Sequence, residues 1–534
     1  MHCHLVSILA SALGALGLAG ALAGPARGDA DPPYAPPPFL AEPPALPPTA
    51  GDQVLRLDLA GAIALAMRQN LGIVVKRSSA RSTRLTVAQT IWSAYEPVLN
   101  LTYGRSGADQ PPATLQAGQP GSLINTSSDT ATASIAQHLP TGGSLGASVS
   151  AGRTLSSSGT AVEPLNYSTS ATVSLSQPLL RGFSTDLAIP QMSILTAKIE
   201  SEKARYDFEA SAATLIQQTE AAYWSVVSRL YAYGIAARSQ QLAEDTTELV
   251  RRQVAAGMTS SAQLPGAEAT LAQRKLAVLT AEAAVDAAWD QLRAILNLPR
   301  DQWALPILPT ERPRFDAGEL PTAEVALDTA IHHRPEIASM HLDMKKLALD
   351  IRQAQNTALP DLGIDVSTSS YGQAPTLGGA IRQLTGHGST GWSSGWSAGL
   401  HLSWAPLGQA NKVNAEMQRI RNEVQIVNQD QLVQTIWSDV RRALRDQRAA
   451  ALQVILASKS RTLTSQSLEI ENRKYASGTS SNIAIATVQN ALAEAEVAEI
   501  EALLNHAAAQ TALLLATGQL LDQRHVKIEI AEER

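Results

Sequence analysis

The sequence predicts an α+β protein built from two related halves, each of which joins long helices to strands with one polar and one apolar face. Two regions, 184–255 and 408–475, repeat Ala and Leu at helical spacing. Several shorter segments alternate apolar with small polar residues, which is the period of a strand between two different surroundings. Corresponding features occur in the same order in both halves, which indicates an internal duplication.

The duplication is clearest in two pairs of segments. LRLDLAGAIALAMRQNLGI, beginning at Leu55, resembles LPTAEVALDTAIHHRPEI, beginning at Leu320. RRQVAAGMTSS, which ends at Ser261, matches ENRKYASGTSS, which ends at Ser481. In these turns a glycine stands where a helix C-cap favours a left-handed residue, and the final serine stands where an N-cap is expected. Each half is therefore expected to contain a tight helical hairpin.

The helix lengths predict how each hairpin is completed. At about 1.5 Å per residue the long helices are rods on the order of 100 Å, and such rods need equally long neighbours to cover their apolar faces. The helices after the turns, 264–297 and 482–517, are shorter, but each can stack on a second helix that starts near Leu71 or Pro335. Each half then supplies one continuous and one composite rod.

The strands carry the rest of the prediction. Rows such as Leu99, Leu101 and Tyr103 alternate with small or polar residues. Strands of this kind suit a tilted crossing between lipid and a watery lumen. A soluble β-sandwich has the same alternation, and this alternative stays open. Three tryptophans either form an aromatic girdle at a membrane interface or simply pack within the sheet: Trp392, Trp396 and Trp404.

Composition argues for an exported protein without a nucleic-acid partner. The formal net charge is −6, whereas nucleic-acid-binding domains are usually basic. Residues 1–23 form an apolar leader with a small-x-small cleavage pattern, which favours a cleaved signal peptide over an anchor helix. The single cysteine, Cys3, precedes the apolar stretch, so lipidation is not favoured. The Pro-rich segment 24–51 cannot enter a helix bundle, and no later stretch is apolar for long enough to form a transmembrane helix.

Three further motifs carry a resemblance to a known family. They are the helix starts at Asn70 and at Arg334-Pro335-Glu336-Ile337, the strand exits SLSQPLLRGFS and LSWAPLGQA, and the two tip glycines. In this order, and duplicated, they resemble the TolC-like outer-membrane efflux family (outer membrane factors) over roughly residues 52–520. The resemblance implies a homotrimer with a shared transmembrane β-barrel in the outer membrane and a periplasmic α-barrel tunnel. It implies as partners a periplasmic adaptor (membrane fusion) protein, an inner-membrane pump and outer-membrane lipid.

The expected organisation follows from the pattern and the resemblance together. It places a signal peptide at 1–23, a periplasmic linker at 24–51, a first repeat at 52–300, an inter-repeat linker at 301–319, a second repeat at 320–520 and a tail at 521–534. Strands are expected near 97–104, 130–178, 361–371 and 396–405, and helical hairpins at 184–297 and 408–517. An added strand pair around the turn at 139–143 leaves four or six strands per protomer open.

The resemblance also implies where the functional sites lie. The periplasmic tip and adaptor-docking residues are expected to be Gly257, Met258, Thr259, Gly478, Thr479 and Ser480. In the best-known member of the family, aspartates ring the constriction just after the second tip glycine, but the matching positions here are Ala484 and Thr487. An acidic, cation-binding ring is therefore not expected at this mouth. The aperture-lining residues are expected to be uncharged: Gln263, Asn482, Ala484 and Thr487.

No enzymatic chemistry is predicted. His332-His333 has no companion at metal-ligand spacing and is interpreted as an exposed helix end. No phosphate-binding glycine loop and no nucleophile elbow occur, so no catalytic residue, metal or cofactor is expected. Four arginines at helical spacing either pair with acidic neighbours or, as the alternative, line the tunnel: Arg441, Arg442, Arg445 and Arg448.

The function expected from these features is a passive export duct. The chain would be the outer-membrane channel of a tripartite efflux or type I secretion system, with its helical tunnel in the periplasm. The alternative is a periplasmic coiled-coil scaffold that never inserts into a membrane.

Overall fold

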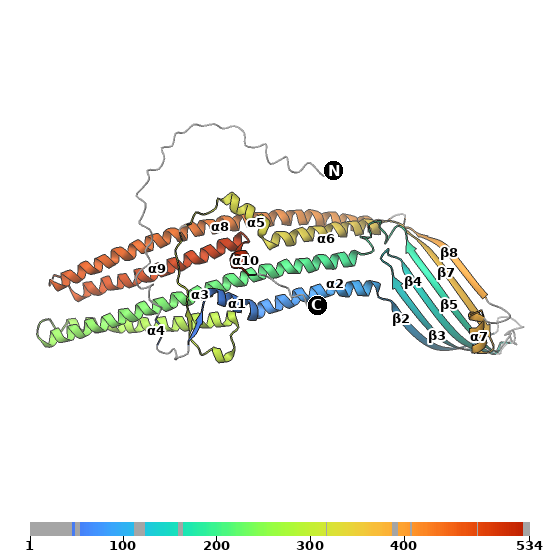
Figure 1. Cartoon of the computed structure of the whole chain (residues 1–534), viewed down its shortest axis with the longest axis horizontal. Coiled ribbons are helices and arrows are strands. Elements are labelled where there is room, and N and C mark those ends of the chain that lie inside the picture. Colours follow the sequence, from blue (N-terminus) through green and yellow to red (C-terminus); the bar gives the residue numbers. More distant parts are fainter. Residues whose placement is uncertain are drawn as a thin grey trace, which may run out of the picture. The chain divides into compact units, whose positions relative to one another are not determined.

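The computed structural model describes residues 45–47, 54–111, 123–158, 164–316, 318–386, 393–405, 408–477 and 479–526. The expected signal peptide, Trp392, Gly478 and residues 527–534 lie outside these ranges. Within the described part, long helices lie side by side and a sheet continues from one end of them (Figure 1). The helices of four or more residues are α1 Leu59–Gln69, α2 Leu71–Tyr95, α3 Met192–Ala255, α4 Gln263–Leu296, α5 Ala323–His333, α6 Pro335–Thr357, α7 Leu377–Leu384, α8 Gln409–Ala476, α9 Asn482–Ala516 and α10 Leu520–Gln523.

In the first half, α2 and α4 lie along α3 and meet end to end (Figure 1). Asn70 separates α1 from α2 with an extended ψ of 125°, and its side chain accepts hydrogen bonds from the N–H groups of Gly72 and Ile73. The same side chain donates to the Ile295 carbonyl at 2.8 Å, at the end of α4. Asn70 is thus an N-cap for α2 and a link to α4, and it joins two short helices into one composite rod.

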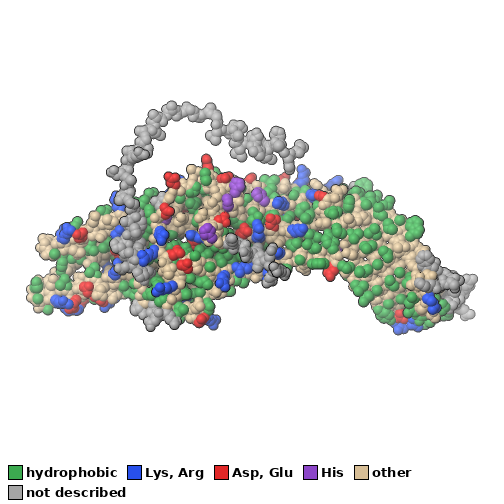
Figure 2. All heavy atoms as spheres, viewed as in Figure 1, with side chains coloured by type: hydrophobic (Ala, Val, Ile, Leu, Met, Phe, Trp, Pro, Cys, Tyr) green, Lys and Arg blue, Asp and Glu red, His purple; other side chains and the backbone are tan. Residues whose placement is uncertain are grey.

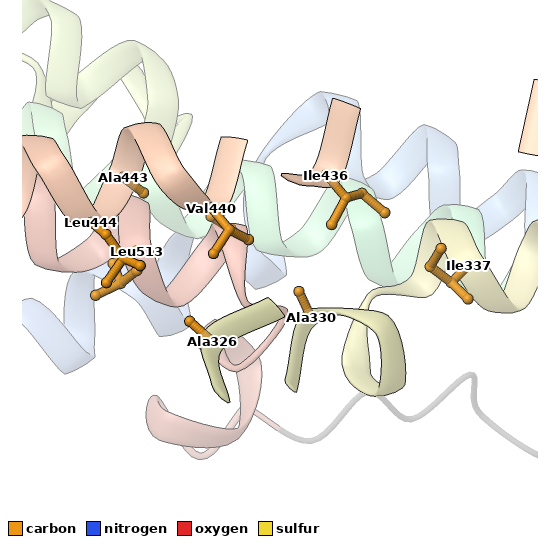
Figure 3. Close-up of a cluster of buried hydrophobic side chains, with 9 residues drawn as sticks. Ala326, Ala330, Ile337, Ile436, Val440, Ala443, Leu444 and Leu513 are labelled. Carbon is orange, nitrogen blue, oxygen red and sulfur yellow. The ribbon is translucent and has the colours of Figure 1, made fainter. Parts of the chain in front are cut away.

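In the second half, α6 and α9 form the corresponding composite rod along α8. Arg334 separates α5 from α6 with a ψ of 126°, as expected for a residue before proline. Its Nε donates to the Ala516 carbonyl at 2.8 Å, at the end of α9. Figure 3 shows an apolar cluster beside this joint, to which α5, α6, α8 and α9 contribute: Ala326, Ala330, Ile337, Ile436, Val440, Ala443, Leu444, Leu513 and Ala516.

Six long strands form one antiparallel sheet in the order β2-β3-β4-β5-β7-β8. Their bounds are β2 Val98–Gln110, β3 Ile124–His138, β4 Ser144–Ser156, β5 Leu165–Pro178, β7 Asp361–Ala374 and β8 Ser393–Ser403. The added pair of strands expected around the turn at 139–143 is β3 and β4, and both are part of the sheet. The register puts Ser, Thr and Gly on one face, as in the row Ser134–Ser148–Thr172, and apolar residues on the other, as in Leu101–Ala133–Val149.

A second, two-stranded parallel sheet ties the start of the described chain to the segment between the halves. It pairs β1 Leu55–Leu57 with β6 Ile307–Pro309. The buried Tyr223 hydroxyl donates to the Leu57 carbonyl at 3.2 Å, and Trp289 Nε1 donates to the Ile307 carbonyl at 2.9 Å. The expected inter-repeat linker thus contains a strand that packs on the first helical hairpin.

The helix-to-sheet junction differs from expectation, because α3 begins at Met192 and not near residue 184. The preceding segment contains Pro190 and turns through Gly182, with a φ of +85°, before the helix can start. Asn356, at the end of α6, holds this segment. Its amide donates to the Leu180 and Phe183 carbonyls, and its carbonyl oxygen accepts from the Gly182 N–H at 2.7 Å.

No single helix in the described part is long and apolar enough to cross a membrane. The consecutive pair α1 and α2, bent by 53°, meets the length and composition required when the two are taken together.

Candidate functional site

The first hairpin tip closes on a left-handed glycine. Gly257 has a φ of +69°, and the N–H groups of Gly257 and Met258 donate to the carbonyls of Val254 and Gln253. This pair of bonds is the Schellman motif that ends a helix with glycine. Met258 is exposed at the turn and Thr259 is partly buried. The expected Ser261 N-cap is wrong, because Ala262 occupies that place without a side-chain bond and the Ser260 and Ser261 carbonyls form the turn instead.

The second tip closes in a similar way. The Thr479 N–H donates to the Lys474 carbonyl at 2.9 Å, and the Ser480 hydroxyl donates to the Glu471 carboxylate. Ser481 is the N-cap of α9, as expected, and accepts from the Ala484 N–H at 3.3 Å. Both hairpin tips lie at the end of the helices opposite the sheet (Figure 1).

A groove of about 300 Å³ lies between the two hairpins near their tips. Its lining brings together Gln263 of α4 and Asn482 and Thr487 of α9, whereas Ala484 does not line it. Most of the remaining lining is Ser, Thr, Ala, Gln and Asn, and Arg274 is the one charged side chain among the described lining residues. Within the described residues this groove therefore carries no carboxylate that could bind a cation.

A set of charges lies further from the tips, where α3, α8 and α9 meet. Arg461 of α8 contacts Glu499 of α9 at 2.6 Å, and their side chains are 17% and 0% exposed. Arg238 of α3 lies 3.6 Å from Glu496 of α9 and so links the two hairpins. Burial raises the pKa of both glutamates, while the neighbouring arginines oppose that rise. Loss of solvation thus outweighs ion pairing at both carboxylates.

The other candidate groups lie apart from this groove. His332 and His333 are exposed at the end of α5, and their Nδ1 atoms contact the Asp328 and Thr329 carbonyls. No group of three or more potential metal ligands occurs in the described ranges. The four arginines between residues 441 and 448 of α8 are exposed; Arg442 lies 3.8 Å from Asp439, and Arg441 stacks on the Trp437 ring at 5.4 Å.

The apolar face of the sheet is the other surface with a functional prediction. Trp396 is 82% exposed on this face and Trp404 is exposed just beyond β8. Figure 2 shows hydrophobic side chains covering much of the visible surface of the sheet. An exposed apolar surface of this extent is unusual for a protein in water and marks contact with a membrane or another chain.

Sequence reasoning missed three residues that organise these regions. Arg334 was noticed as part of a motif but not as a link to α9, and Asn356 and Arg461 were not singled out. Their positions carry a weak local signal, since an Asn at a helix end or an Arg on a long helix is common on a surface. Their partners are distant in sequence and are brought close by the hairpin packing.

Comparison with known proteins agrees with this architecture. The family described as Outer membrane efflux protein matches residues 93–298 and 326–519, one segment in each half. The fold resembles the Campylobacter jejuni CmeC outer membrane channel, with 14% identity, a TM-score of 0.61 and 86% of each chain covered. It also resembles the open-state Neisseria gonorrhoeae MtrE outer membrane channel, with 19% identity, a TM-score of 0.60, and 86% of this chain and 89% of that chain covered.

A third similar structure is the Vibrio cholerae outer membrane protein VceC, with 13% identity, a TM-score of 0.60, and 86% of this chain and 96% of that chain covered. No curated protein sequence matches the chain. The matched segments span more than half of the chain and include both helical hairpins. On these grounds, the chain belongs to the outer membrane efflux protein family.

Proposed function

We propose that this chain is the outer-membrane channel of a tripartite efflux or type I secretion system and acts as a passive duct. The observation that carries the proposal is the sheet with two chemically opposite faces. One face is rich in Ser, Thr and Gly, and the other is largely apolar and exposed. A strand surface between lipid and a water-filled lumen has this pattern, whereas a periplasmic scaffold surrounded by water would not require an exposed apolar face.

The edges of the sheet support assembly of several copies. β2 and β8 are the outer strands, and each has a neighbour on one side within the described sheet. Unpaired backbone groups are costly in lipid, so a spanning sheet closes on itself. One chain supplies six strands, and closure of β2 of one copy on β8 of the next in a homotrimer would give a barrel of eighteen.

Within the described residues, one side of α8 is also uncovered. α8 exposes Val413, Met417, Ile420, Val424 and Val427, which are spaced alternately by four and three residues. This is the heptad spacing of a helix that packs against another helix. A neighbouring copy of the chain would cover this stripe and complete an α-barrel tunnel in the periplasm.

The hairpin tips are proposed to dock the adaptor and the inner-membrane pump. Both tips lie at the end farthest from the sheet, where a periplasmic partner can reach them (Figure 1). The docking residues are Gly257, Met258, Thr259, Gly478, Thr479 and Ser480, and the uncharged aperture is formed by Gln263, Asn482, Ala484 and Thr487.

Reconstitution into planar bilayers tests the channel. Purified protein is expected to require detergent, to migrate as a trimer and to give discrete single-channel conductance. Protein that stays in the aqueous fraction without detergent and shows no conductance would support the scaffold instead.

A photo-crosslinking residue tests the docking site. Placed at Met258 or Thr479, it is expected to capture the adaptor in cells, and placed at the exposed Arg419, near the sheet end of α8, it should not. Equal capture from all three positions would contradict adaptor docking at the hairpin tips.

A further inference from the structure

The apolar face of the sheet carries charge in one region. Among the described strand residues on this face, the charged side chains are Arg105, Asp109, Asp129 and Arg153. All four lie in the half of β2, β3 or β4 that is farther from the helices (Figure 1). Figure 2 shows charged side chains gathered at that far end, beyond the hydrophobic surface. Lipid-facing arginines are costly at the bilayer centre and tolerated near its interfaces.

Three of these side chains form one row across neighbouring strands. The register pairs Asp129 with Arg105 on one side and with Arg153 on the other. Asp129 Oδ1 lies 3.6 Å from Arg105 Nε, and Oδ2 lies 3.3 Å from Arg153 Nη1. The Tyr103 hydroxyl donates to the same carboxylate at 3.1 Å. A single carboxylate thus holds two guanidinium groups on one surface.

The row has an excess of positive charge that is open to its surroundings. The Arg105 and Arg153 side chains are 69% and 45% exposed, whereas Asp129 is 18% exposed. The remaining carboxylate of this region, Asp109, accepts a hydrogen bond from Asn125 at 2.6 Å. Each guanidinium has five N–H donors, so one shared carboxylate leaves most of them available.

The neighbours of the row are of a residue type that is typical of a membrane interface. Tyr103 precedes Arg105 on the same face, and Tyr167 pairs with Arg153 on β5. Tyrosine is enriched where lipid meets water, because its ring is apolar and its hydroxyl is polar. In the proposed channel the far strand ends reach the leaflet opposite the periplasm, so the row lies at the headgroups of the outer leaflet.

We propose that Arg105 and Arg153, held by Asp129, bind the phosphate groups of an anionic glycolipid in the outer leaflet. Guanidinium forks bind phosphate oxygens in pairs. The two arginines are two strands apart, or on the order of 10 Å, so one bulky headgroup can span them. This proposal rests on the proposed function, since it requires the apolar face to contact the membrane.

Native mass spectrometry of the detergent-solubilised full-length protein tests the site. The probes are bisphosphorylated lipid A, dephosphorylated lipid A and phosphatidylglycerol. Wild-type protein is expected to bind bisphosphorylated lipid A at least about tenfold more tightly than either other lipid. The double variant Arg105→Gln with Arg153→Gln is expected to lose about a hundredfold, and Arg419→Gln, an exposed arginine on α8, should bind as wild type does.

Unchanged binding in the double variant, or equal binding of dephosphorylated lipid A, would overturn the proposal. Equally tight phosphatidylglycerol binding would overturn the assignment to a glycolipid. Single-channel conductance of the same samples separates this result from the channel proposal, because wild-type protein that conducts without lipid preference contradicts only the lipid site. If the double variant does not assemble, Arg105→Gln alone is expected to lose about tenfold.

Discussion

The helical parts of the two halves use one backbone plan with different side chains. An offset of 221 residues relates Gly257 to Gly478 and Asn297 to Gly518. At the sites where the composite rods join, an Asn70 amide binds the end of α4 in the first half and an Arg334 guanidinium binds the end of α9 in the second. The end of a helix needs a donor for its unpaired carbonyls, and either group supplies one. The backbone geometry therefore constrains these joints more than the residue type does.

The halves differ more strongly inside the hairpins. The buried pair Arg461 and Glu499 lies in the second hairpin, and the same offset leads to Gln240 and Val278 in the first. A carboxylate that is fully buried depends on its partner, whereas Gln240 bonds locally to Glu244. At these matched positions the second hairpin is thus more sensitive to the loss of a single charge.

Replacing Arg461 by Ala is expected to have the largest effect. It leaves Glu499 buried without its partner, which should lower the free energy of unfolding by about 3–5 kcal/mol. Gln240→Ala, at the matching place, should cost no more than about 1 kcal/mol. Guanidinium unfolding in detergent, followed by the helical circular dichroism signal, measures both. The double variant Arg461→Met with Glu499→Leu should recover most of the loss, and equal costs in the two hairpins would contradict the contrast.

Gly518→Ala is expected to give the next largest loss in the free energy of unfolding. Gly518 has a φ of +75°, and an added Cβ would lie 2.8 Å from the backbone carbon of His333. Left-handed strain and the clash with a neighbouring backbone together should cost about 2–4 kcal/mol. The same unfolding measurement tests this value, and a cost below about 1 kcal/mol would show that the joint between α9 and α6 can open without loss.

Gly257→Ala separates left-handed strain from the clash with a neighbouring backbone. The φ of Gly257 is +69°, close to that of Gly518, but no neighbouring atoms crowd it. An added Cβ there meets nothing within 4 Å. The expected cost is therefore the left-handed strain alone, about 1–2 kcal/mol. Unfolding of this variant beside Gly518→Ala measures the difference, and identical costs would mean that packing at the joint contributes nothing.

Glu496→Gln is expected to give the smallest effect, visible as a change with pH. Burial raises the pKa of Glu496 above its ordinary value of 4.5, so the stability it contributes is present below that value and is lost as pH rises through the folded-state pKa. Glutamine does not titrate. The variant should therefore gain stability relative to wild type as pH increases from 4.5, in unfolding curves recorded at several pH values. A difference that does not vary with pH would exclude this role.

Much of the fold is readable from local patterns. The long helices follow from the periodicity of 184–255 and 408–475, and the first tip follows from the glycine at 257, which closes α3 in the left-handed conformation. The start of α3 was misplaced because a strand exit, a proline and a left-handed turn occupy 179–191 without a clear periodicity. The groove was not predicted; of the residues expected to line the aperture, Gln263, Asn482 and Thr487 also line this groove and Ala484 does not.

The sequence by itself determined the features that depend on near neighbours: the duplicated plan, the rod lengths, the first tip and the two-faced strands. Periodicity and helix capping act over a few residues, so a single sequence expresses them. The tertiary structure decided that all six strands form one sheet, that Gly518 is crowded where Gly257 is free, and that Arg105, Asp129 and Arg153 form one row. Strand register and hairpin packing join residues far apart in the chain, and no local pattern specifies those distances.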